Sequence, residues 1–599
     1  MNTVKHKALG SLSGAILGLW VTVASATDVI LQVPAGADDL DASLRGASLS
    51  VETAASDDAT AQDIMAATRA DYGRLSAALY QAGYYGGVIS ILVDGREAAN
   101  ISPLAQASTV SRIVIRVQPG PRFSFSEASI TPLVPGTTPP EGFAPGQPAF
   151  SETIGDAVRD SVDAWREVGH AKVEITDQRL TADHRNAKLS ARITLDPGPR
   201  LRFGNLIVTQ PSNVRPERIV EIAGLPTGKI YSTEDLRRSS ERLRDTGAFS
   251  SVVLEDADTI RPVNTLDINA TVTDAAPRRI GAGAELSSLE GLTLSGFWLH
   301  RNLFGGAERL RFDGEVGGIG GESGGIDYIL SVLYERPATF TPDTTLVLGS
   351  RIQELDEPDF RERSIQIGGG VRHRFSDDLS GDLGIQYQFS DVDDAFGSRR
   401  LEHVLLPGGL TYDDRDDPLN ATKGIFADLE VTPFIGLDND AAGARVFLDV
   451  RNYQAFGEND RFVFAARGQI GFVSGARASE VPPDMLFFSG GAGTVRGQDY
   501  QSLGVPISPT EQIGGRSFAA ISAELRADIK GPWGAVGFVD YATIGQGSFF
   551  DGFTDDHAGA GFGVRYDTGV GPIRVDVATP IGSNAGENFE LYIGIGQAF

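Results

Sequence analysis

Apolar and polar residues alternate along the last stretch of the chain. From Phe589 to Phe599 an apolar residue stands at nearly every second position, and Gln597 is the exception. This period of two predicts a β-strand that runs to Phe599 and has Phe599 on its apolar face. Such a strand fits a membrane barrel, in which one face meets lipid and the other a polar lumen. Because an unpaired strand edge is costly in lipid, we expect this strand to pair with the first strand of the same barrel.

The same alternation recurs between turns throughout residues 277–599. It predicts sixteen strands, an even number as in bacterial barrels, and therefore a 16-stranded antiparallel outer-membrane β-barrel. The predicted strands are 279–287, 292–301, 307–316, 325–336, 344–354, 363–375, 380–392, 401–412, 424–434, 442–455, 460–473, 516–528, 533–545, 556–567, 571–579 and 588–599.

The first half of the chain is a repeat. A proline in a similar short motif recurs every 78 residues, at Pro121, Pro199 and Pro277. The period predicts three α+β modules, which we place at 27–119, 120–197 and 198–276. Each module reads as strand, helix, helix, strand, strand, which gives a small sheet with helices on one face and a free edge.

A glycine in each module marks the end of a predicted helix. These residues are Gly83, Gly169 and Gly247, and each is followed by a strand. Glycine just past a helix end is the usual left-handed cap. The modules are either plain spacers or docking units, because a free sheet edge can bind an extended client strand through its backbone.

The composition and a predicted targeting signal restrict where the protein can reside and which partners it can bind. Residues 1–26 have the basic, apolar and small-residue parts of a secretory signal, and the apolar run is shorter than the ~20 residues of a spanning helix. The formal charge of -27 opposes binding to nucleic acid. Cysteine is absent, and glycine makes up 72 of 599 residues, with most of the surplus after residue 280. This shift in composition marks the start of the barrel.

The longest connection between predicted strands, 474–515, is a candidate functional loop. Its glycine-rich run ends in three residues, Val495, Arg496 and Gly497. If the loop folds back into a desolvated lumen, the Arg496 guanidinium needs a carboxylate partner. Asp540 is the candidate, because it shares the inward face of a predicted strand with Phe538. A surface arginine in a mobile loop fits the spacing equally well.

Taken together, these features resemble the POTRA-containing outer-membrane assembly and secretion superfamily. The resemblance covers the three modules, the barrel, Val495 to Gly497 in the sixth outer loop, Phe538 and Asp540 on the thirteenth strand, and the last strand. Within the superfamily the chain is most similar to the TamA-like branch. The resemblance implies that the modules are POTRA domains and that Arg496 pairs with Asp540. Two residues depart from the family pattern, Gln498 in place of an aromatic residue and Ala542 in place of a glycine.

The resemblance also implies a function. We expect an assembly factor in the outer membrane of a Gram-negative bacterium, with its POTRA domains in the periplasm and outer-membrane lipid around its barrel. It would help to insert unfolded β-rich clients such as autotransporters, and a TamB-like periplasmic protein would dock on the POTRA domains.

The mechanism expected is a weak lateral seam between the first and last strands. The seam residues are Gly281 and Gly283 on the first strand and Gly594, Gly596 and Phe599 on the last. The alternative is a two-partner secretion transporter, which exports an exoprotein through the lumen. A passive porin explains the barrel but not the periplasmic modules.

Catalytic and metal-binding functions find little support in the sequence. Residues 321–325 fit a nucleophile-elbow pattern, but they lie in a predicted hairpin with no helix after it. The aspartates between 413 and 417 have oxygen ligands for calcium, yet Arg415 stands among them and a solvated turn is the favoured interpretation. The seven histidines lack metal-ligand spacing. We predict no enzyme, no cofactor and no metal site.

Overall fold

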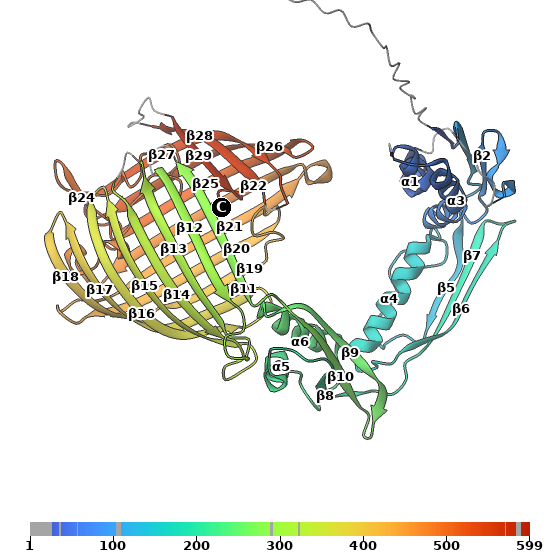
Figure 1. The fold of residues 1–599 in the computed structure, drawn as a ribbon, viewed down its shortest axis with the longest axis horizontal. Coiled ribbons are helices and arrows are strands. Elements are labelled where there is room, and N and C mark those ends of the chain that lie inside the picture. The colour runs from blue at the N-terminus through green and yellow to red at the C-terminus, as the bar shows by residue number, and fades with distance from the viewer. Residues whose placement is uncertain are drawn as a thin grey trace, which may run out of the picture. The chain divides into compact units, whose positions relative to one another are not determined.

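The computed structural model describes residues 27–34, 38–56, 58–102, 109–287, 291–321, 324–569, 571–582 and 589–599. The chain forms two compact units, one of residues 1–201 with 230–233 and one of residues 202–229 with 234–599 (Figure 1). The predicted signal peptide, residues 1–26, lies outside the described residues.

The first sheet and its helices open the first unit. In spatial order the sheet contains β1 (Asp28–Gln32), β4 (Arg112–Gln118), β2 (Val88–Val93) and β3 (Arg96–Glu97). The helices are α1 (Asp38–Ala47), α2 (Leu49–Ala54) and α3 (Ala61–Gln81), followed later by the short η1 (Ala98–Asn100). Leu44 and Leu75 of the helices share one apolar core with Ile113 and Ile115 of β4.

The second sheet has fewer helices than predicted. Its order is β5 (Ser124–Thr131), β7 (Lys188–Asp196), β6 (Glu174–Asp183), and α4 (Ser151–Glu167) packs on it. The prediction of two helices is wrong for this module, since its described residues form one. The intervening stretch, 132–150, holds six prolines, which remove backbone donors and break helices.

The third sheet follows the predicted order of elements. It contains β8 (Arg202–Val208), β10 (Thr265–Asp274) and β9 (Phe249–Arg261), with helices α5 (Pro216–Ala223) and α6 (Thr233–Asp245). Gly83, Gly169 and Gly247 all have a positive φ, which confirms them as left-handed positions after helices.

The remaining strands close into the predicted barrel (Figure 1). Seventeen strand segments form the ring among the described residues, and two of them, β18 and β19, are halves of one strand that is broken at Leu406 and Pro407. This confirms the 16-stranded antiparallel barrel. The segments are β11 (Arg278–Ser287), β12 (Gly291–His300), β13 (Arg309–Ile319), β14 (Asp327–Arg336), β15 (Thr344–Glu357), β16 (Phe360–Arg374), β17 (Leu379–Asp394), β18 (Gly397–Leu405), β19 (Gly408–Asp413), β20 (Gly424–Gly436), β21 (Ala442–Phe456), β22 (Phe462–Ser474), β25 (Ser517–Lys530), β26 (Trp533–Gly545), β27 (Thr554–Tyr566), β28 (Ile573–Ile581) and β29 (Glu590–Ile595).

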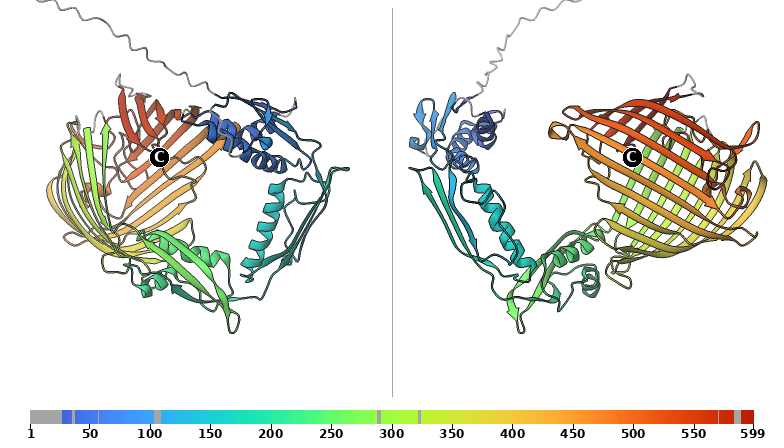
Figure 2. Two further views of the ribbon diagram at one scale, coloured as in Figure 1. Left: turned by 45° about the vertical axis from the view of Figure 1, so that its right-hand side comes forward. Right: turned by 180° about the vertical axis from the view of Figure 1, so that it is seen from behind.

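The strands of the barrel run obliquely (Figure 2). Their side chains alternate between an apolar outer face and a polar inner face. Leu383 and Ile385 of β17 are exposed on the outside, whereas Glu524 of β25 and Asp576 of β28 are buried on the inside. This alternation suits a wall between lipid and lumen. Among the described residues, no helix has the length and hydropathy needed to cross a membrane.

The prediction that the last strand runs to Phe599, with Phe599 on the outer face, is wrong. β29 ends at Ile595, and Gly596 takes a φ of 89° that turns the chain inward. Phe599 is buried against Ala421 and Tyr453. In the views of Figures 1 and 2 the carboxy terminus falls within the outline of the barrel. Sequence periodicity missed this turn because glycine also fits a strand.

Candidate functional site

The long loop 475–516, between β22 and β25, folds into the barrel. It contains two 3-10 turns, η3 (Ala478–Glu480) and η4 (Pro483–Met485), and a hairpin of β23 (Val505–Ser508) and β24 (Glu511–Ile513). Its apolar residues, among them Phe487 and Leu503, share a buried core with residues of the barrel wall such as Phe518 and Ile544. The loop is therefore an ordered part of the lumen.

Arg496 stands at the centre of the loop and is only 3% exposed. Its Nε donates to Asp540 Oδ2 at 2.8 Å and its Nη2 to Asp540 Oδ1 at 3.0 Å, which is the bidentate geometry of strong arginine-carboxylate pairs. The Arg496 backbone N–H also donates to Asp540, at 3.2 Å. The guanidinium carbon lies 3.6 Å from the ring centre of Phe538.

Further charges extend this pair into a buried network. Arg496 Nη1 donates to Glu524 at 2.7 Å, and Glu524 in turn accepts from Arg526 Nε at 2.9 Å. Asp576 lies 3.8 Å from Arg496 and pairs with Arg565. Three arginines thus face three carboxylates, so the network is balanced in charge. Removing one member would leave a buried charge without its partner.

Two glycines allow the loop to approach the wall. A methyl group on Gly559 of β27 would lie 1.9 Å from the Arg496 carbonyl oxygen. Gly497 has a φ of 90°, and its own side chain would lie 2.7 Å from backbone atoms of Thr579. The Gly497 N–H donates to the Tyr592 hydroxyl at 3.1 Å. These contacts fix the loop tip against β27, β28 and β29. Val495, which precedes the arginine, is fully buried.

The structure shows the contacts of the two residues that depart from the family pattern, Gln498 and Ala542. Gln498 Nε2 donates to the Ala558 carbonyl at 2.6 Å, so it binds the wall through its amide. Ala542 is fully buried in the core that the loop shares with the wall. Tyr500, two residues after Gln498, donates to Glu357 at 3.1 Å on the opposite wall.

The predicted seam is the thinnest pairing among the described strands of the ring. Among the residues that the structure describes, β11 and β29 pair through Leu286 with Ile593 and Ser287 with Tyr592, whereas β11 pairs with β12 over ten residues. Continuing this register would place Gly283 opposite Gly596, not opposite Gly594.

Arg574 of β28 bridges this seam. Gly594 separates Arg574 from β11 and has no side chain, so Arg574 lies over it and its Nη2 contacts Glu285 at 3.5 Å. On β11, Phe297 of β12 covers Gly281, and a methyl group there would lie 2.3 Å from its ring.

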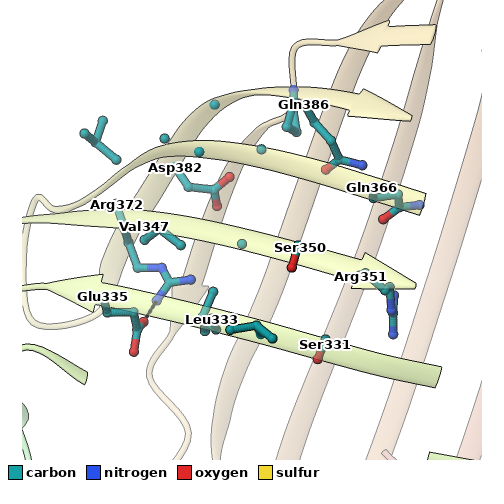
Figure 3. A pocket seen from close by; sticks show the side chains of 18 of the residues that line it. Ser331, Leu333, Glu335, Val347, Ser350, Arg351, Gln366, Arg372, Asp382 and Gln386 are labelled. Carbon is teal, nitrogen blue, oxygen red and sulfur yellow. Dashed lines mark hydrogen bonds and ion pairs between the residues drawn. The ribbon is translucent and has the colours of Figure 1, made fainter. Parts of the chain in front are cut away.

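A cavity of about 710 Å³ with a mixed polar and apolar lining lies along β13 to β17 (Figure 3). Arg372 and Glu335 meet there at 3.2 Å, and Asp382, Gln366 and Gln386 also line it. Gly349, Gly368 and Gly384 also line the cavity and add no side chain to it.

The aspartates of the turn 414–423 hold the turn itself. Asp416 accepts from the backbone of Thr422 at 2.9 Å, and Asp417 accepts from the backbone of Leu419 at 2.8 Å. Asp413, at the end of β19, forms a bidentate pair with Arg415. Ser323, the serine of the elbow-like pattern, lies outside the described residues.

Sequence reasoning identified Arg496 and Asp540 but missed the rest of the network. The missed residues are Glu524, Arg526, Arg565, Asp576 and Tyr592. A signal was present, since Glu524 and Arg526 are two charged residues on one face of a strand that also carries apolar residues on the other. Their partners come from strands distant in sequence, which periodicity does not reveal.

Comparisons with known proteins agree with this architecture. Residues 302–599 match the Omp85 superfamily domain. Among solved structures, BamA from Haemophilus ducreyi lacking POTRA domains 1-3 is similar with a TM-score of 0.60 and 17% identity, over 79% of this chain and 100% of that one. CdiB from Acinetobacter baumannii is similar with a TM-score of 0.51 and 12% identity, over 79% and 89%.

Curated relatives include chloroplast proteins. Outer envelope protein 80 of Arabidopsis thaliana is 25% identical over 61% of this chain, and that of Oryza sativa subsp. japonica is 26% identical over 63%. The match spans 52% and 60% of the length of these relatives.

The modules resemble POTRA domains, and the protein resides in the outer membrane with these domains in the periplasm. Members of the superfamily are transport and assembly proteins that interact with clients and partners. The barrel domain of the chain, residues 302–599, belongs to the Omp85 superfamily.

Proposed function

We propose that this protein is a TamA-like assembly factor that inserts β-rich clients, such as autotransporters, into the outer membrane. The observation that carries the proposal is the seam of β11 and β29, with its two pairs of residues. A short ladder costs little to open, and an opened edge exposes backbone donors and acceptors to an incoming strand.

The proposal assigns roles to the periplasmic modules. β6 is a free edge of the second sheet, and nearly all of its ten residues are exposed. Such edges suit the docking of extended client segments or of a TamB-like periplasmic protein.

Locking the seam tests the proposal. Leu286→Cys with Ile593→Cys places two thiols on register partners, in a chain that has no other cysteine. Under oxidation we expect a folded barrel that loses client insertion and regains it with reductant. The matched control is Leu294→Cys with Val316→Cys, a cross-strand pair in the longer β12 to β13 ladder, which should leave insertion intact. Normal insertion by the locked seam would contradict lateral opening.

The second candidate is a two-partner secretion transporter that exports an exoprotein through the lumen. The cavity along β13 to β17 favours it, because charged and amide side chains such as Arg372, Asp382 and Gln386 line it (Figure 3). A locked seam would not affect export through the lumen, so the same cysteine pair distinguishes the two functions.

A further inference from the structure

The segment 596–599, which follows β29, is held by the turn between β19 and β20. This turn, 414–423, lies about halfway round the ring of strands from β29. The Gln597 backbone N–H donates to the Leu419 carbonyl at 3.1 Å, and Gln597 Nε2 donates to Asn420 Oδ1 at 2.9 Å. The turn therefore reaches across the lumen to bind the end of the last strand.

Arg526 of β25 holds the same two segments together. Its Nη2 donates to the Phe599 carbonyl at 3.0 Å, and its Nη1 donates to the Ala421 carbonyl at 3.3 Å. The Phe599 ring packs with Ala421, Tyr453 and Ala465 in a small buried cluster. Polar and apolar contacts thus hold the segment in the same position.

These contacts join the network around Arg496 into a closed ring. Gln597 Oε1 accepts from Arg565 Nε at 2.7 Å, and Arg565 pairs with Asp576 beside Arg496. On the other side, Glu524 links Arg496 to Arg526. The turn, the segment 596–599 and the loop tip are therefore parts of one hydrogen-bonded structure.

We propose that the turn 414–423 is a clasp that holds the segment 596–599 inside the lumen and so keeps β29 short. The register of Leu286 with Ile593, if continued, would place Phe599 opposite Ile280. Both residues would then face lipid, as the period-two pattern of the sequence requires. The clasp opposes that extended conformation, and Gly596, with its φ of 89°, is the hinge. The influence of the clasp on opening of the seam between β11 and β29 rests on the proposed function. The existence of the clasp does not depend on that function.

Thiol labelling of the full chain tests the clasp directly. Ala598→Cys, partly buried against the Phe599 cluster, reports the position of the segment in the folded protein in detergent. We expect Gln597→Leu and Asn420→Ala each to raise its rate of labelling by a membrane-impermeant maleimide about tenfold, because each removes hydrogen bonds of the clasp. Gln366→Leu, the same chemical change on the far wall, should leave the rate unchanged. Equal rates in all variants would overturn the clasp.

A second variant guards against misfolding and tests the hinge. Gly596→Ala causes no clash, since its methyl group would lie in ordinary contact with Leu419 at 3.7 Å, but it disfavours the positive φ. Combined with Ala598→Cys, it should raise the rate of thiol labelling while the barrel keeps its folded mobility on gels.

Disulfide formation between Ala284→Cys and Ile595→Cys then reports extension of β29 along β11. The yield of this disulfide should increase when Gln597→Leu or Asn420→Ala is added. Faster labelling of Ala598→Cys without a higher yield of this disulfide would overturn the extended conformation. The result of locking Leu286→Cys to Ile593→Cys would not be affected by that outcome.

Discussion

Arg496 is the residue on which the lumen structure depends most. Its side chain is almost fully removed from water, and it satisfies Asp540 and Glu524 at the same time. A buried charge network of this kind adds little stability over apolar packing, but breaking it is costly. It suits a loop that must adopt one defined position.

Arg496→Ala should destabilise the folded barrel by about 3–5 kcal/mol, because it leaves the buried Asp540 carboxylate without its cation and removes one of the two cations that Glu524 contacts. Denaturant unfolding in detergent measures this, and client assembly should fall more than the amount of barrel in the membrane. Arg361→Ala is the control, since Arg361 is a half-exposed partner of Glu354 and should cost less than ~1 kcal/mol. A double-mutant cycle with Asp540→Asn should show strong coupling, and additive effects would argue against the pair.

The loop 475–516 is the element that divides the lumen. On the wall opposite Arg496, Asp484 of η4 accepts from Gln388 at 3.2 Å. Burial raises the pKa of the Asp484 carboxyl, although the hydrogen bond from Gln388 and the charges of Arg445 and Arg351 oppose this. The docked loop therefore binds a proton more tightly than the undocked loop does.

Docking of the loop should weaken as the pH rises. A carboxyl whose pKa is raised in the docked state favours docking at low pH, and this advantage disappears as the pH passes above that pKa. Asp484→Asn keeps the shape and removes the charge, so it should make protection of the loop from protease less dependent on pH above the usual pKa of an aspartate. Asp499→Asn, an exposed carboxylate in the same loop, should behave like the parent. A parent loop that is equally protected across this range would count against the argument.

The sequence predicted which strands and helices form better than it predicted where each one ends. Period-two alternation found all sixteen strands, because one face of each must be apolar in lipid. It extended β29 through Gly596 to Phe599, since the Arg526 and Leu419 contacts that turn the chain inward come from a strand and a turn that are distant in the sequence. Local pattern also suggested a second helix before α4, where the prolines of 132–150 prevent one.

At the scale of the whole molecule, the third module is tied to the barrel within one compact unit. Arg242 of α6 donates to both oxygens of Asp343, at 2.7 and 2.8 Å, in the turn between β14 and β15. Arg374 of β16 pairs with Asp245 at 2.6 Å. These contacts lie on the same side of the barrel as the turn 414–423.

Two deletions separate docking from barrel stability. Removing residues 27–276 should leave a barrel that folds in detergent, with a slightly lower melting temperature, because exposed ion pairs such as Arg374 with Asp245 are worth ~0.2–1 kcal/mol each. Removing residues 27–197 keeps the third module and should leave the melting temperature unchanged. Both deletions should abolish client assembly, because both remove the exposed edge of β6. Full client assembly by the shorter deletion would place docking on the third module, and full assembly by the longer one would remove the docking role from all three.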